Sequence, residues 1–340
     1  METRKIYLSG GSTYVVSLPK RWVERHRLSQ GDSLIVSEEN DAIVFSPSFK
    51  SKPPTTKTIK CSKIASPQLF EKTLIAYYLA GYDTIALEMD VDDPTYFRKV
   101  AWAVAQRLIG VEIIEDTLSK LSIEVLLDPE RIPITKTLRK LSNVCHSMMR
   151  DTVKVFENAD TKLASDMQTR ENEVDRLYFL AIRQLKEAAS SSQLAKKLDI
   201  QNTGDAIEYR VVVQNIERIS DHMGRISKNV LSILEVAERG ATLKEFVDVS
   251  SSILSLYERA LQPIISREYS VPPEVFEMEN SINEMLLHRL GHMMNAKDIP
   301  ANEALMRRGI LSSLDRIKSY TIGIAESVIN LQATAGDMDT

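Results

Sequence analysis

The stretch Ile216–Asp221, IERISD, has a counterpart 98 residues further along the chain at Leu314–Ser319, LDRIKS. A second pair, ENEVD at Glu171–Asp175 and ENSIN at Glu279–Asn283, is separated by 108 residues. Apolar positions that follow the first pair keep the same register, so the match runs along one face of a helix. A longer connection in the first copy, AASSSQLAKK, accounts for the difference between the two offsets. The repeat therefore predicts two tandem units of three helices each.

The region that holds this repeat has the composition of a helical domain. No proline occurs between residues 134 and 262, and proline is the residue that most strongly interrupts a helix. Helical periodicity is broken only near residues 158–160, 190–200, 240–243, 270–273 and 296–301. These breaks predict six helices between residues 134 and 335.

The composition of the whole chain is that of a globular protein with more than one domain. Its 340 residues are 43% hydrophobic and 26% charged, which excludes a disordered chain. The first residues lack the apolar run of a secretory signal, and no stretch approaches the roughly 18 apolar residues of a membrane span. We therefore expect a cytoplasmic protein without membrane insertion. The two cysteines lie far apart and exclude a zinc site built from thiolates.

Residues 1–47 have the pattern of a small β domain. Short strands are expected at 6–8, 14–18, 33–37 and 42–45, with a brief helix after Pro19. So few residues cannot bury both faces of a sheet, so we expect this domain to pair with a second copy. A segment rich in proline, serine and lysine at 47–57 is predicted to be a linker.

The N-terminal region is basic although the chain as a whole is acidic. Residues 1–57 carry nine lysines and arginines and six acidic residues, whereas the formal charge of the chain is −4. Five cations cluster around the first strand and the brief helix: Arg4, Lys5, Lys20, Arg21 and Arg25. In a dimer they would double into a surface able to meet the phosphates of duplex DNA. The alternative is an ordinary solvated surface.

Between these two regions, residues 58–128 alternate strands with helices. Helices are expected at 67–80 and 94–109, separated and followed by short β-branched runs. Such alternation predicts a small α+β domain with two helices packed on one sheet. We find no ligand-binding motif in it.

Two pairs of carboxylates in the first three-helix unit are candidates for a metal site. Glu171 and Asp175 are four residues apart on one helix, and Glu217 and Asp221 are four apart on another. If these helices lie side by side, four carboxylates converge, and they destabilise one another unless a multivalent cation neutralises them. Oxygen ligands suit hard ions such as Mg²⁺ and Mn²⁺, or iron. A single acidic pair at this spacing is common by chance, so the hypothesis depends on its recurrence in the second unit.

The second unit preserves only part of that pattern. Glu279 and Asp315 occupy equivalent positions, but their partners are Asn283 and Ser319. A metal site here is therefore expected to be weaker than in the first unit.

A histidine pair lies on the same predicted helix as Glu279. His288 and His292 are four residues apart without the glutamate of an HExxH motif, which argues against metalloprotease chemistry. They could ligate a metal together with Glu284, or simply decorate a polar face.

The motif NIERISDH, with E-x-x-x-D on the preceding helix and a repeat of both, resembles the PhoU family over residues 134–335. The resemblance implies two three-helix bundles, a multinuclear metal centre that is often iron or zinc, and regulation of phosphate uptake without catalysis. The full motif falls on four residues, Glu171, Asp175, Glu217 and Asp221. Half of it falls on Glu279 and Asp315.

The N-terminal segment resembles a second family. Tyr14–Lys20, followed by Leu28–Asp32, is similar to swapped-hairpin dimers of the AbrB/SpoVT type, which often bind DNA. With the α+β region in between, the order of domains resembles that of archaeal PhoU-like regulators.

Together these observations predict a mainly α multidomain protein with three parts: a swapped-hairpin β domain (1–47), a small α+β domain (58–128) and a six-helix double bundle (134–335). We expect a homodimeric, metal-binding regulator of phosphate uptake that binds DNA through its first domain and is not an enzyme. The alternative is an adaptor that contacts a phosphate transporter or sensor kinase and uses the β domain only to oligomerise. A metallo-hydrolase, the third class, would need turnover that disappears in Asp221→Ala.

Overall fold

The computed structural model describes residues 2–39, 42–47, 54–128, 132–236, 242–295 and 299–335. It divides into two units, Met1–Pro54 and Thr55–Thr340, each of which is described by itself below. Most of the predicted linker at 47–57 lies outside the described residues.

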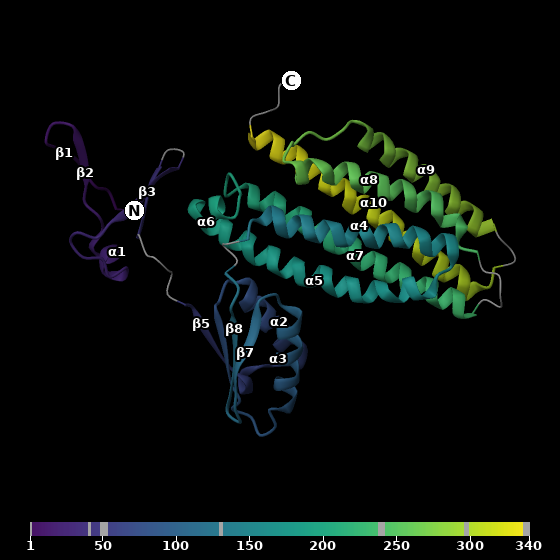
Figure 1. Ribbon diagram of the computed structural model, residues 1–340, viewed down its shortest axis with the longest axis horizontal. Coiled ribbons are helices and arrows are strands. Elements are labelled where there is room, and N and C mark those ends of the chain that lie inside the picture. The colour runs from purple at the N-terminus through teal and green to yellow at the C-terminus, as the bar shows by residue number, and fades with distance from the viewer. Residues whose placement is uncertain are drawn as a thin grey trace. The chain divides into compact units, whose positions relative to one another are not determined.

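The first unit consists of two β-hairpins and a short helix (Figure 1). Its elements are β1 (Ile6–Ser9), β2 (Thr13–Val16), α1 (Lys20–Arg25), β3 (Leu34–Glu39) and β4 (Ala42–Pro47). The first hairpin turns at Gly10 and Gly11, whose φ angles of 61° and 81° suit glycine. The expected strand at 14–18 ends earlier, at Val16, because Pro19 has no N–H to donate and restricts the residue before it.

None of the described residues in this first unit is buried. Large apolar side chains stand in solvent on both strands of the first hairpin, among them Ile6 at 68% and Tyr14 at 75% exposure. Two isolated hairpins of this kind form no hydrophobic core and are marginal in water.

The second unit begins with the α+β domain. Its elements are β5 (Thr56–Lys60), α2 (Pro67–Leu79), β6 (Thr84–Glu88), α3 (Thr95–Arg107), β7 (Val111–Asp116) and β8 (Lys120–Val125), with a 3-10 turn at Cys61–Lys63. The strand order is β5-β6-β8-β7, with β5 parallel to β6 and the other pairs antiparallel. Apolar residues of α2 and α3 form one core with the sheet, around Phe70, Leu74 and Ile85. The prediction of two helices on one sheet is confirmed.

The rest of the second unit is helical, and in its described residues the six long helices are those that the repeat predicts, with one short helix, α6, in addition. They are α4 (Ile134–Asn158), α5 (Thr161–Ser190), α6 (Ser192–Lys197), α7 (Asp205–Val236), α8 (Val247–Ser266), α9 (Glu274–Asn295) and α10 (Ala301–Ala335), with a 3-10 turn at Lys244–Phe246 before α8. The short α6 lies in the longer connection of the first copy. Helix ends follow local chemistry: Ala159 turns the chain at φ 54°, and the Asp160 side chain caps α5 by accepting from the amides of Lys162 and Leu163.

The two three-helix units share one hydrophobic core rather than forming separate ones. Helix α7 of the first three-helix repeat packs along α10 of the second repeat, and also contacts α4 and α5 (Figure 1). Two glycines of α10 permit this close approach. An ideal Cβ on Gly309 would lie 2.7 Å from Nδ2 of Asn229, and one on Gly323 would lie 2.7 Å from Nδ2 of Asn215.

None of the helices in the described parts of the chain contains an apolar stretch of the length needed to span a lipid bilayer.

These contacts predict opposite effects of glycine-to-alanine changes in two helices. Gly323→Ala should lower the free energy of unfolding by about 1 kcal/mol, because overpacking against buried Asn215 costs about 1–3 kcal/mol and exceeds the helix-propensity gain. Gly291→Ala on α9, where a Cβ meets nothing within 4 Å, should raise it by up to about 1 kcal/mol. Urea unfolding measures both, and a Gly323→Ala variant as stable as Gly291→Ala would contradict the packing argument.

Candidate functional site

The acidic residues of the repeat lie where α5 packs against α7. Glu171 and Asp175 belong to α5, and Glu217 and Asp221 belong to α7. Both helices are long and regular here, and the four-residue spacing places each pair on a single helix face. Val174 and Ile216, next to these acids in sequence, are fully buried, so the carboxylates lie at the edge of the helix–helix contact.

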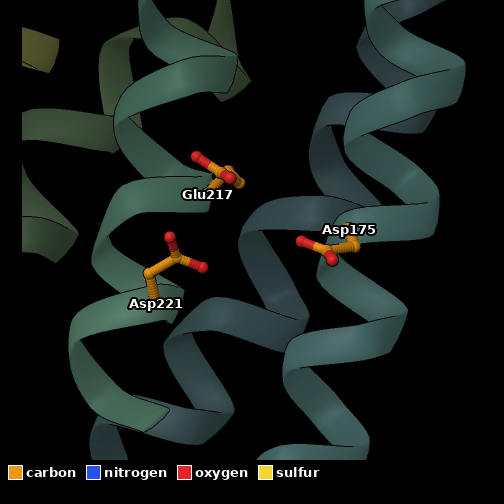
Figure 2. Close-up of side chains that lie close together, drawn as sticks. All are labelled: Asp175, Glu217 and Asp221. Carbon is orange, nitrogen blue, oxygen red and sulfur yellow. The ribbon is translucent and has the colours of Figure 1, made fainter. Parts of the chain in front are cut away.

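Three of the four carboxylates meet. One oxygen each from Asp175, Glu217 and Asp221 lies within 4.8 Å of the other two. Figure 2 shows Glu217 and Asp221 on one helix and Asp175 on its neighbour, with the carboxylates around the space between them. We call these three residues the acidic cluster.

The fourth acid, Glu171, stands beside this cluster rather than in it. Its carboxylate packs against Gly224 of α7, where a Cβ atom would clash with Oε2. Its charge still interacts with those of Asp221 and Asp175. The convergence of four carboxylates expected from the sequence is therefore a group of three with a fourth at its edge.

Burial and mutual repulsion make the charges of the acidic cluster costly. Burial, followed by the charges of Asp221 and Asp175, raises the pKa of Glu217 to about 7. Burial is also the main cause that raises the pKa of Asp175 and of Asp221 above the usual range. The folded protein therefore favours either protonation of the cluster or a cation beside it.

One cation near the cluster comes from the α+β domain. Nη2 of Arg107, the last residue of α3, lies 3.5 Å from Oδ2 of Asp175. It lowers the pKa of Asp175, but less than burial raises it.

The donor set fits a hard cation. Ligands of one ion at about 2.0–2.4 Å are at most about 4.8 Å apart, and the three oxygens satisfy that limit. All three are carboxylates, the donors that Mg²⁺, Mn²⁺ and iron accept.

The second repeat carries an ammonium group in the corresponding place. Nζ of Lys318 donates to Oδ1 of Asp315 at 2.8 Å and also to Oδ1 of Asn283. Its side chain is only 7% exposed. Glu279 lies on the same helix as Asn283 and is half-buried. The equivalents of Asp175 and Glu217 are thus bridged by a lysine.

The four histidines of the helical region make their described contacts with groups outside the acidic cluster. The Nε2 atoms of His288 and His292 are 3.1 Å apart, so each ring is a hydrogen-bond partner of the other. His222 packs its ring against Tyr320 of α10, 5.7 Å between centroids, and burial lowers its pKa to about 4. Nε2 of His146 lies 2.6 Å from Oε1 of Glu258.

The basic residues proposed for DNA binding lie on the surface of the first unit. Arg4, Lys5, Lys20, Arg21 and Arg25 are all exposed. Arg4 forms an ion pair with Glu2, and Lys20 lies 3.7 Å from Glu24.

Two residues at these sites were not singled out from the sequence. Lys318 aligns with Ser220 in the repeat. Comparison of the two copies could have found it, because it places a charged residue at a position that is otherwise buried. Arg107 has no such signal, because it lies 68 residues from Asp175 in the chain.

Comparison with known proteins identifies the families of these regions. The PhoU domain model matches residues 138–230, which include the acidic cluster. The model of the antidote-toxin recognition protein MazE, a bacterial antitoxin, matches residues 7–51. The chain is a PhoU-like protein with an N-terminal AbrB-type domain. Both resemblances stated from the sequence are thereby confirmed.

Curated relatives of this PhoU-like chain come from two strains of Xylella fastidiosa, Temecula1 and 9a5c. Each is a phosphate-specific transport system accessory protein PhoU homolog, 25% identical over 122 residues, which is 36% of this chain and 48% of the relative. The chain thus spans about half the length of the curated relatives it matches.

Solved structures of similar fold include two PhoU proteins. PhoU from Pseudomonas aeruginosa matches with a TM-score of 0.50 and 17% identity, over 59% of this chain and 96% of that one. The phosphate transport system regulatory protein PhoU from Streptococcus pneumoniae matches with a TM-score of 0.50 and 14% identity, over 59% and 94%. These likenesses confirm the helical fold of the PhoU-like region.

The raised pKa of Glu217 predicts a pH-dependent stability of chelator-treated protein. An acid whose pKa is raised by folding binds its proton more tightly in the folded state, so stability should fall as pH rises through about 7 and be regained towards pH 5. Between pH 5.5 and pH 8 we expect a difference of about 1 kcal/mol after allowance for solvent screening. Urea unfolding at pH 5.5 and pH 8 measures it.

Glu217→Gln should remove most of this pH dependence. Asp166 is an exposed acid on α5 that pairs with Arg170, so Asp166→Asn should leave the pH dependence unchanged. Equal pH dependence in wild type and Glu217→Gln would show that this carboxyl does not carry the effect.

Proposed function

We propose that this chain is a metal-binding regulator of phosphate uptake without catalytic activity of its own. The observation that supports the proposal most directly is the acidic cluster, three half-buried carboxylates within 4.8 Å of one another in a PhoU domain. Such a cluster is destabilised unless it is protonated or a cation accompanies it. Asp175, Glu217 and Asp221 would hold the ion, with Glu171 at its edge.

A bound ion would supply positive charge shared between two helices. Because Asp175 belongs to α5 and the other two ligands to α7, occupancy would favour one spacing of these helices, and the surface they present would depend on the ion. The all-oxygen donor set supports Mg²⁺, Mn²⁺ or iron, and zinc is a further candidate. In the second repeat, a metal held by Glu279 and Asp315 stays a prediction that has to accommodate the ammonium of Lys318.

The role in phosphate uptake is supported by the relatives. Those from Xylella fastidiosa are accessory proteins of a phosphate-specific transport system. We propose a similar role here, exerted by contact with a phosphate transporter or its sensor protein in the cytoplasm.

The first unit is proposed to form a homodimer that binds duplex DNA. Its exposed apolar strands need a covering surface, and a second copy provides one with matching shape. Dimerisation would also double its set of exposed basic side chains.

The second candidate is an adaptor that binds no DNA. It is favoured by the ion pairs that already engage two of the cations, Arg4 with Glu2 and Lys20 with Glu24. In that case the β domain only joins two chains.

The metal proposal predicts at least about one equivalent of a divalent or trivalent ion in protein purified without chelator. The double variant Glu217→Gln, Asp221→Asn should lose it, because two of three ligands become neutral. Asp166→Asn on α5 is the matched control and should retain it. Elemental analysis measures the ion, and less than a tenth of an equivalent in wild type, with no rise in melting temperature on adding Mg²⁺, Mn²⁺ or iron, would count against the site.

The DNA proposal predicts binding to duplex DNA whose affinity falls steeply with salt, because each phosphate contact releases counterions. Replacing Arg4 and Lys5 by alanine should weaken binding by about tenfold or more at low salt. Replacing Lys136 and Lys140, two lysines of α4 in the PhoU-like region, should not. Fluorescence anisotropy measures this, and no binding even at low salt would favour the adaptor.

A further inference from the structure

One face of α5 is covered by the α+β domain. Four residues at successive four-residue steps mark this face: Asp175, Phe179, Arg183 and Glu187. Phe179 packs against the core of the α+β domain. Arg183 is 2% exposed and donates from Nη1 to the carbonyl oxygens of Tyr78 and Tyr82, each at 2.9 Å. Asp175, a member of the acidic cluster, therefore stands at the boundary between the helical bundle and the α+β domain.

Arg107 occupies that boundary from the other side. Its guanidinium forms an ion pair with Glu71 of α2 through Nη1, and Nη2 lies 3.5 Å from Asp175. Its Cζ lies 5.9 Å from the centroid of the Phe179 ring. The side chain is 38% exposed, so it is not locked in place and has Glu71 as a second anionic partner.

The two repeats thus obtain positive charge in different ways. In the second, Lys318 comes from α10, the helix that also carries Asp315, and its ammonium is buried between its partners. In the first, the equivalent position is Ser220, which carries no charge and donates to Sδ of Met148. The cation that forms the described ion pair with the acidic cluster is Arg107, which belongs to the α+β domain and pairs with Asp175.

We propose that Arg107 competes with the metal ion for Asp175, so that the α+β domain sets the occupancy of the acidic cluster. This inference rests on the proposed metal site. An ion beside Asp175 repels the guanidinium, and Arg107 then keeps only its pair with Glu71. Because binding linkages are reciprocal, whatever tightens the contact between α3 and α5 weakens ion binding, and the ion loosens that contact.

Calorimetric titration of the full chain with Mn²⁺, after chelator treatment, tests the competition. Arg107→Gln removes the positive charge and should bind Mn²⁺ about two- to tenfold more tightly than wild type, because the pair is partly solvent-screened. Arg107→Lys keeps the charge and should stay closer to wild type. Arg98→Gln is the matched control: Arg98 lies on the same helix but pairs with Asp116, and its loss should leave Mn²⁺ affinity unchanged.

Hydrogen exchange gives the reciprocal readout. Addition of Mn²⁺ to wild type should speed amide exchange in the last turn of α3 and should have no such effect in Arg107→Gln.

The outcomes separate the two proposals. If wild type binds Mn²⁺ and Arg107→Gln binds it equally or more weakly, the competition is overturned while the metal site stands. If neither protein binds Mn²⁺, the metal site itself fails and the competition fails with it. Tighter binding in Arg107→Gln but not in Arg98→Gln, together with the exchange result, supports the assignment.

Discussion

The close packing of α7 along α10 is the constraint on which the helical region depends. Asn215 and Asn229 of α7 rest on Gly323 and Gly309 of α10, and this contact joins the two repeats into one hydrophobic core. Helix α7 also packs against α4 and α5. With so many neighbours, it has little room to shift or rotate, and its acidic face is held against α5.

A fixed α7 places like charges where they cannot move apart. Asp175, Glu217 and Asp221 meet in a partly buried position, where each raises the electrostatic cost of the others. The second repeat lowers a similar cost with the ammonium of Lys318, a permanent part of the fold. The first repeat has Ser220 at the position of Lys318. The α7 cations Arg218, Arg225 and Lys228 lower the pKa of Asp221 by less than burial raises it, and this leaves a place for a further cation.

The α+β domain reaches the acidic cluster through its packing on α5. Arg183 anchors it to the end of α2, and Arg107 reaches Asp175 two helical turns away on the same face of α5. A domain without any ligand motif in its sequence thereby contributes to the electrostatics of the acidic cluster. Its proposed relevance to function follows from where it docks, because docking brings its Arg107 to Asp175.

The helices, the repeat and the acidic positions could be predicted from the sequence, because helical periodicity and the shared face of residues four apart are local properties of the chain. The four-residue spacing of Glu217 and Asp221 could be interpreted without knowing any neighbour. The position of Glu171 beside the cluster, against Gly224, and the bridge that Lys318 forms between Asp315 and Asn283 became visible only in the folded chain. It alone brought Arg107 to Asp175 across 68 residues. Such contacts depend on how helices that are distant in the sequence pack and on which side chains share the space between them, and no local sequence pattern encodes that packing.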